Sequence, residues 1–226
     1  MIDTHAHLDA LDDPGEVVAR AREAGVGRIL TVGTDVAGCR RALELADAHD
    51  GVFAILGIHP HAANDATEAD VAEVRSLLAH PKAVGAGEMG LDWFRYYAPR
   101  EAQQRLFARM LAVAQATGKP AVIHTRAADA DTLAALERGW YVSFAGNATF
   151  PKAVDLRLAA TKVPAGRILA ETDAPYLAPQ AVRGKRNEPA HVMHTLAALA
   201  QARGEDPHEL ERQIDLNATE CFSLPG

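Results

Sequence analysis

The sequence predicts an α/β fold of the TIM-like (β/α) barrel type, distorted or incomplete, in which about seven strands are recognisable. Short apolar runs alternate with helical patterns along most of the 226 residues. The runs are continuously apolar, as expected of parallel strands that are covered on both faces. No linker rich in glycine, serine or proline divides the chain, so we expect a single barrel domain over residues 1–226.

The predicted strands are short apolar runs separated by helical patterns. From residue 189 onward the pattern is helical only. A complete barrel of this type has about eight strands, so one strand has no counterpart. The seven runs predicted to be strands are residues 2–4, 28–32, 52–58, 83–88, 121–124, 140–144 and 168–171.

Two of the predicted helices carry clear end signals. Asp13 can cap the first helix, Pro14 suits its first turn, and Gly25 is a natural stop. The second helix covers residues 101–117 and is followed by Gly118. These signals set the helices between the predicted strands, as a parallel sheet requires.

Composition excludes several classes of protein. Apolar residues make up 48% and charged residues 23%, which excludes a disordered or collagen-like chain. No apolar run approaches the roughly 18 residues of a membrane span. The net charge of −7 does not attract nucleic acid, so an anionic substrate needs a local positive site. With no N-terminal targeting pattern, and with Cys39 and Cys221 expected as free thiols, we expect a cytoplasmic protein.

Five titratable residues fall where a barrel would hold its active site. His5 and His7 are two residues apart in a strand and should face the same side. Glu88, His124 and Asp173 close or follow three further apolar runs. Each alone has an ordinary explanation as a core or loop residue. Together they favour a metal site, because the carboxyl ends of parallel barrel strands converge on one face.

The donor types narrow the choice of metal. Imidazole and carboxylate donors without thiolate suit Zn²⁺, Mn²⁺ or Fe²⁺, and Mg²⁺ less well. Five ligands exceed what one ion usually takes from protein while it also holds water. Two ions about 4 Å apart that share a bridging carboxylate would use all five ligands.

Six motifs in order carry a family resemblance. They are DTHAHLD (3–9), GIHPH (57–61), GEMGLD (87–92), VIHTR (122–126), ETDAPYL (171–177) and RGKRNEPA (183–190). With them the sequence resembles the TatD-like metal-dependent deoxyribonucleases, a branch of the amidohydrolase superfamily. The resemblance covers the chain from residue 1 to about residue 222.

The resemblance implies a hydrolase that acts on ester bonds and cleaves phosphodiester bonds in DNA by metal-activated water. His5, His7 and Asp173 would hold the first metal, Glu88 would bridge, and His124 would hold the second. Asp173 and Glu88 would be catalytic, with Asp173 orienting the water and accepting its proton. The implied cofactor is one or two divalent ions, Mn²⁺, Mg²⁺ or Zn²⁺, and the implied partner is DNA or another phosphodiester.

Five further residues are candidates for substrate binding. His59 and His61 follow the third predicted strand, and Arg126 lies two residues after the predicted ligand His124. Arg183 and Arg186 belong to the only dense basic cluster and could grip a phosphate backbone. For the two histidines the alternative is an ordinary surface turn, and for Arg126 it is a contact with a nearby carboxylate. For the basic cluster the alternative is a solvated charged face.

One motif of the family has no counterpart. The family has a further strand that ends in histidine, but residues 126–188 contain no histidine. A predicted helix over 128–138 runs directly into the next family motif, so one strand and about one helix are missing. The second metal would keep only Glu88 and His124 and should bind more weakly.

Some interpretations stay open at this stage. The aromatic residues of segment 93–97 could stack on bases or form an apolar lid. A hydrolase of a small cyclic amide, ester or lactone is an alternative function. A degenerate, non-catalytic homologue that kept the scaffold is a third.

Overall fold

The computed structural model describes residues 1–128 and 140–225, so the predicted helix over 128–138 lies almost entirely outside the described residues. The chain forms two compact units. Unit 1 comprises Met1–Thr31, His49–Val52 and Trp140–Gly226, and unit 2 comprises Val32–Ala48 and Phe53–Gly139. The described part contains the seven strands that were predicted. The single-domain organisation stays a prediction.

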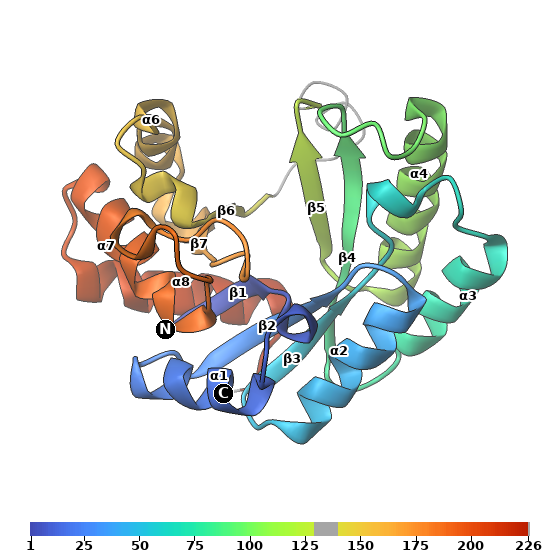
Figure 1. The fold of residues 1–226 in the computed structure, drawn as a ribbon, viewed down its shortest axis with the longest axis horizontal. Helices are drawn as coiled ribbons and strands as arrows, with labels where there is room; N and C mark the ends of the chain where they lie inside the picture. Colours follow the sequence, from blue (N-terminus) through green and yellow to red (C-terminus); the bar gives the residue numbers. More distant parts are fainter. Residues whose placement is uncertain (129–139, 226) are drawn as a thin grey trace. The chain divides into compact units, whose positions relative to one another are not determined.

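Unit 1 combines two pairs of parallel strands with helices (Figure 1). Strand β1 (Ile2–Ala6) pairs with β2 (Arg28–Gly33), and β6 (Val142–Phe144) pairs with β7 (Ile168–Ala170). All five residues of β1 are buried. The helices of this unit are α1 (Pro14–Glu23), α6 (Val154–Lys162), α7 (Val192–Arg203) and α8 (Pro207–Phe222).

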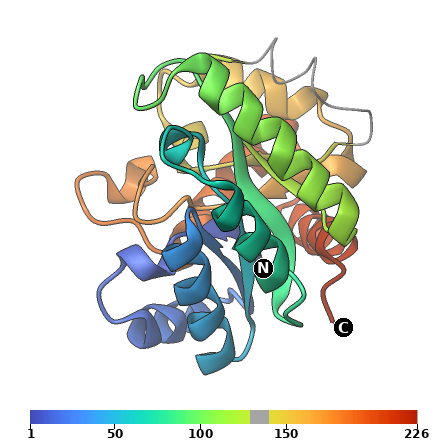
Figure 2. The ribbon, with the colours of Figure 1, turned by 90° about the vertical axis from the view of Figure 1, so that its right-hand side faces the viewer.

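Unit 2 holds the end of β2 and three more parallel strands in chain order. These are β3 (Val52–Leu56), β4 (Ala83–Asp92) and β5 (Ala121–Arg126). Figure 2 shows helix α4 (Arg100–Thr117) running along β4, against which it packs. The other helices of unit 2 are α2 (Val36–Ala48), α3 (Glu68–Leu77) and the short η2 (Pro60–Ala62).

Strands β4 and β5 are longer than predicted. They stay paired up to Asp92 opposite Arg126, so Glu88 and His124 lie within strands and do not close them. The apolar run ends earlier than the strand because hydrogen bonding, not hydrophobicity, sets where a ladder stops. Among the described strands, β5 pairs only with β4, which leaves its other edge without a strand. This open edge agrees with an incomplete barrel.

The helix signals read from the sequence are confirmed. The Asp13 carboxylate accepts the Glu16 amide at 3.1 Å, and α1 begins at the predicted proline. Helix α4 ends at Gly118, whose φ of +65° is a conformation that glycine adopts without strain. No helix in the described part is long and apolar enough to cross a membrane.

Candidate metal centre

Unit 1 brings together three of the predicted metal ligands. The rings of His5 and His7 meet edge to face with centroids 5.1 Å apart, as their spacing in a strand predicts. Asp173 Oδ1 lies 3.9 Å from His5 Nε2 and 3.6 Å from His7 Nε2. These three side chains form the donor set expected for the first metal.

Backbone pairing explains why Asp173 reaches β1 from so far along the chain. The Asp173 amide donates to the His5 carbonyl at 2.9 Å, and the His7 amide donates to the Ala174 carbonyl at 2.7 Å. The segment after β7 therefore continues alongside β1 as a parallel bridge. Asp173 itself has a φ of +55°, a left-handed conformation that aspartate and asparagine tolerate better than most residues.

Asp3, to which the sequence assigned no role, is hydrogen-bonded to residues next to this group. Its buried carboxylate accepts the Thr172 amide at 2.9 Å and the Thr172 hydroxyl at 2.6 Å. It also accepts the His5 amide at 3.3 Å. Burial raises the pKa of Asp3 to about 7, although these hydrogen bonds act in the opposite direction. Asp3 thus ties the chain on either side of the histidine–aspartate group together.

Unit 2 holds the remaining predicted ligands, Glu88 on β4 and His124 on β5. Glu88 Oε1 lies 3.0 Å from His124 Nδ1, and the Glu88 side chain is 12% exposed. The register places Gly90 directly opposite His124. A side chain at Gly90 would approach the His124 carbonyl oxygen to 2.0 Å, and its φ is +144°. Glycine is therefore required for the close approach of the two strands here. The bridging role of Glu88 stays a prediction.

His59 joins this pair, although the sequence suggested a role in substrate binding. Its ring lies 4.5 Å from the His124 ring, between centroids. Donor atoms of His59, Glu88 and His124 all lie within 4.8 Å of one another. With metal–donor bonds of about 2.0–2.2 Å, small side-chain movements would bring all three onto one ion. The donor set fits a divalent metal, and His59 is a candidate third ligand beside the two that the sequence predicted for the second metal.

Asp92 is a functional candidate that the sequence analysis missed, although it ends the GEMGLD motif. It is fully buried, and its Oδ2 lies 2.9 Å from His61 Nε2 and 3.3 Å from His124 Nε2. Its Oδ1 accepts the amides of Phe94 and Arg95 at 2.9 and 2.8 Å. Burial opposes ionisation, but these hydrogen bonds outweigh it and lower the pKa of Asp92 to about 2.

The charge on Asp92 affects the pKa of the neighbouring His124. Burial alone would lower the pKa of His124, but its contacts with Glu88 and Asp92 raise it above the ordinary value. A carboxylate behind a metal-binding imidazole fixes the orientation of the ring and increases its basicity. Asp92 stands in that position toward His124, whose other nitrogen faces Glu88.

The predicted substrate-binding residues have varied surroundings. His61 lies between Asp92 and the ring of Tyr97. In unit 2 the Arg126 guanidinium stacks on the Phe94 ring at 4.2 Å. In unit 1 the other two arginines have partners of their own: Arg183 stacks on Phe150 at 4.1 Å, and Arg186 pairs with Asp12 at 2.5 Å. A phosphate would have to compete with Asp12 for Arg186.

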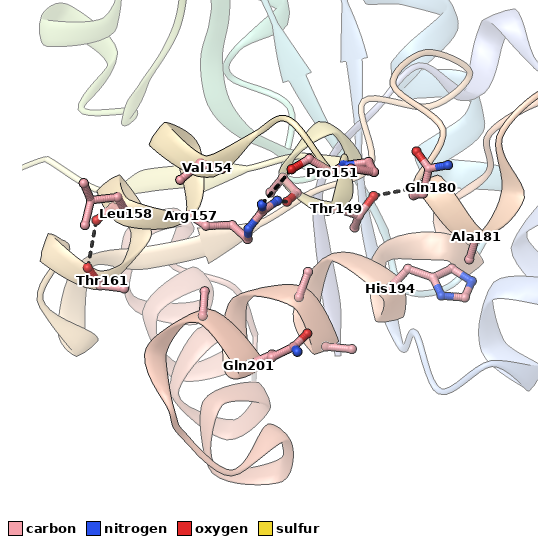
Figure 3. A pocket seen from close by; sticks show the side chains of 14 residues that line it. Thr149, Pro151, Val154, Arg157, Leu158, Thr161, Gln180, Ala181, His194 and Gln201 are labelled. Atoms are coloured by element: carbon pink, nitrogen blue, oxygen red, sulfur yellow. Dashed lines mark hydrogen bonds between the residues drawn. The ribbon is translucent and has the colours of Figure 1, made fainter.

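Unit 1 also contains a groove of about 890 Å³ between α6 and α7 (Figure 3). Leu158 of α6 and Ala198 and Gln201 of α7 are among the residues that line it. His194 also lines it, but no carboxylate does. The groove therefore lacks the mixed donors that a metal centre needs and is separate from the group of His5, His7 and Asp173.

Comparison with known proteins gives a family match along the chain. The family model described as TatD related DNase matches residues 2–138 and 133–223, two stretches that share residues 133–138. The deletion itself stays a prediction. The chain is 33% identical to the uncharacterized metal-dependent hydrolase YabD of Bacillus subtilis, over 99% of both chains. It is also 33% identical to the 3'-5' ssDNA/RNA exonuclease TatD of Cronobacter sakazakii, over 93% of this chain and 92% of that protein.

A solved structure gives the same result for the fold. The crystal structure of the TatD homologue YjjV from Escherichia coli K12 matches with a TM-score of 0.92 and 26% identity. The match covers 100% of this chain and 98% of that one. The predicted α/β class, a distorted TIM-like barrel, is thereby confirmed. With the family model matched along nearly the whole chain and the motifs folded into two histidine–carboxylate groups, the chain belongs to the TatD related DNase family.

Proposed function

We propose that the protein is a metal-dependent phosphodiesterase that hydrolyses DNA. The observation that carries the proposal is the group of His59, Glu88 and His124, whose donor atoms converge within 4.8 Å. The buried, ionised Asp92 behind His124 supports it, because such carboxylates accompany metal-binding histidines. The relative from Cronobacter sakazakii named as an ssDNA/RNA exonuclease supports a nucleic-acid substrate.

In this proposal the two groups have distinct tasks. His5, His7 and Asp173 would hold one divalent ion, and His59, Glu88 and His124 would hold another. A bound ion would lower the pKa of its water toward about 7, so that the water can lose a proton at neutral pH. Asp173 orients the attacking water and accepts its proton. A bond forms between the water oxygen and phosphorus while the bond to the departing sugar oxygen breaks, and that oxygen takes up a proton from solvent.

Asp3 and Asp92 act as positioning residues. Asp3 holds the Thr172 backbone and side chain, which fixes the approach of Asp173 to the histidines of β1. Asp92 holds the rings of His61 and His124. Such positioning matters for rate, because misplacement of a catalytic group by about 1 Å can cost on the order of 10²-fold.

A fluorescent single-stranded oligonucleotide tests the proposal. The protein is freed of metal with chelator, dialysed and assayed with and without added Mn²⁺, Mg²⁺ or Zn²⁺. We expect cleavage that depends on added metal and is lost in Asp173→Asn. If neither single- nor double-stranded DNA is cleaved with any of these ions, the proposal is wrong. Turnover of a lactone or cyclic amide would then support the alternative hydrolase, and no turnover would support a non-catalytic homologue.

A further inference from the structure

Three aromatic rings stand exposed on unit 2 just after β4. Phe94 is 61% exposed, Tyr96 70% and Tyr97 62%, whereas the neighbouring Trp93 is 7% exposed. Large aromatic side chains normally contribute to a core or an interface, so a group of exposed rings signals a binding surface. We call Phe94, Tyr96 and Tyr97 the aromatic platform. Their exposure argues against the apolar lid, which would bury them.

The backbone that carries the platform is held in place at both ends. At its start, Asp92 Oδ1 accepts the amides of Phe94 and Arg95. Gln103 of α4 accepts the Asp92 amide at 2.9 Å and donates to the Ala98 carbonyl at 2.9 Å. The segment is therefore fixed before a ligand arrives, which lowers the entropic cost of binding to it.

Three arginines surround the rings. Arg126 stacks on Phe94 at 4.2 Å, Arg95 donates to the Tyr97 hydroxyl at 3.2 Å, and Arg100 donates to the Tyr96 hydroxyl at 3.3 Å. All three are exposed. In the described part of the chain no ion pair pairs them with a carboxylate. They make a local positive site on a protein of net charge −7.

The platform is continuous with the candidate metal centre of the same unit. The Tyr97 ring lies 4.7 Å from the His61 ring, between centroids. His61 in turn contacts Asp92, which contacts His124. A planar group resting on Tyr97 would therefore lie beside the residues proposed to hold metal.

We infer that the aromatic platform stacks an unpaired base of a single-stranded nucleic acid, while Arg95, Arg100 and Arg126 face its phosphates. The inference rests on the proposed function and names the feature that selects single strands. Rings interleaved with cations are the usual means of holding single strands, since every base has a face that can stack. A base paired within a duplex cannot offer that face.

The test compares Phe94→Ala, Tyr96→Ala and Tyr97→Ala with the wild-type protein. Loss of a stacking partner should raise KM for a single-stranded oligonucleotide roughly 5- to 150-fold, with a smaller change in kcat. The ring-preserving Tyr97→Phe should raise KM less than Tyr97→Ala does, which separates the stacking contribution from that of the hydroxyl contact with Arg95. Leu216→Ala, at a residue of α8 that is 64% exposed, is the control for loss of an exposed apolar side chain.

Binding is measured separately from catalysis. An oligonucleotide that carries 2-aminopurine is added to metal-free protein, and stacking is read as quenching of its fluorescence. We expect quenching by the wild type and by Tyr97→Phe and its loss in the alanine variants. A matched oligonucleotide with abasic positions in place of the bases should bind the wild type as weakly as the intact strand binds the alanine variants.

The outcomes distinguish the inference from the proposed function. If the wild type cleaves DNA but folded alanine variants keep its KM and quenching, the inference is wrong and the proposed function stands. If the alanine variants keep the wild-type KM and quenching but differ from the wild type in the molecular mass measured by sedimentation, the platform is a protein interface and the inference is again wrong. If the wild type cleaves no nucleic acid, the proposed function fails and the inference falls with it.

Discussion

Replacing Asp92 by asparagine changes a single atom at a point where two histidines meet. Oδ1 accepts the amides of Phe94 and Arg95, and an asparagine carbonyl can keep both bonds. Oδ2 faces the ring nitrogens of His61 and His124 at 2.9 and 3.3 Å. The substitution Asp92→Asn therefore removes the charge toward the histidines while it preserves the turn that carries the aromatic platform.

The size of the effect follows from these two contacts. A hydrogen bond to a charged group contributes about 1.5–3 kcal/mol, and a neutral one about 0.5–1.5 kcal/mol. When both hydrogen bonds change from charged to neutral, about 2 kcal/mol is lost in total, which is roughly 30-fold in an equilibrium constant. This falls within the roughly 10–100-fold loss of metal affinity that removal of such supporting carboxylates causes.

Calorimetric titration of metal-free protein with Mn²⁺ measures the loss. We expect one binding step to weaken roughly 30-fold in Asp92→Asn, the figure derived above for two bonds that lose their charge. Asp35→Asn is the matched control, because Asp35 Oδ1 also accepts a backbone amide, that of Gly38 at 2.7 Å. In the described part of the chain Asp35 makes no hydrogen bond or ion pair with a histidine. A folded Asp92→Asn protein that binds Mn²⁺ within about twofold of wild type would refute the reasoning, since the lost bonds should cost about 30-fold.

The same carboxylate predicts a pH dependence of stability. The pKa of Asp92 is lowered from 3.8 to about 2, so the folded state favours its ionised form. Its stabilisation is fully present above the unfolded pKa and is lost as the pH falls through the folded one. Metal-free wild type should lose about 2 kcal/mol from this group between about pH 5 and pH 2. The free energy of unfolding, measured with urea at each pH, should fall less over this range in Asp92→Asn than in the wild type. An equal fall in both proteins would contradict the assignment of this loss to Asp92.

Three further predictions concern the other candidate residues. Asp173→Asn should lower hydrolysis by roughly 10²-fold or more with the fold unchanged, since asparagine tolerates the φ of +55°; more than about a tenth of wild-type rate would exclude its role as base. His59→Ala should weaken one metal-binding step by at least about tenfold in elemental analysis after dialysis, because it removes one of three donors; unchanged retention would return His59 to substrate binding. Neutralising Arg183 and Lys185 should reduce the slope of log affinity for DNA against log salt by about one unit per lost phosphate contact. Arg186 should contribute less, because it is paired with Asp12. An unchanged slope would show that the cluster is an ordinary solvated face.

Local rules explain why much of the fold could be predicted from the sequence. Apolar runs gave the seven strands, and the cap at Asp13 and the stop at Gly118 gave the ends of α1 and α4. The proximity of His5 and His7 also followed, because a period of two residues in a strand is set by the backbone alone. The motifs sufficed for the family, since they lie in order along nearly the whole chain.

Contacts between distant segments were decided only by the tertiary structure. The approach of Asp173 to His5 depends on a parallel bridge between segments far apart in sequence. The grouping of His59 with Glu88 and His124 depends on where the turn after β3 falls beside β4 and β5.

The role of Asp92 illustrates the same division. From the sequence it is the last residue of the GEMGLD motif, but neither its burial nor its histidine partners can be predicted from its position. In the fold it is fully buried, bonded to two histidines and ionised down to about pH 2. The sequence by itself determined which residue types stand at which strands. Strand register and burial, which arise only when distant segments pack, decided which of them touch and what charge they carry.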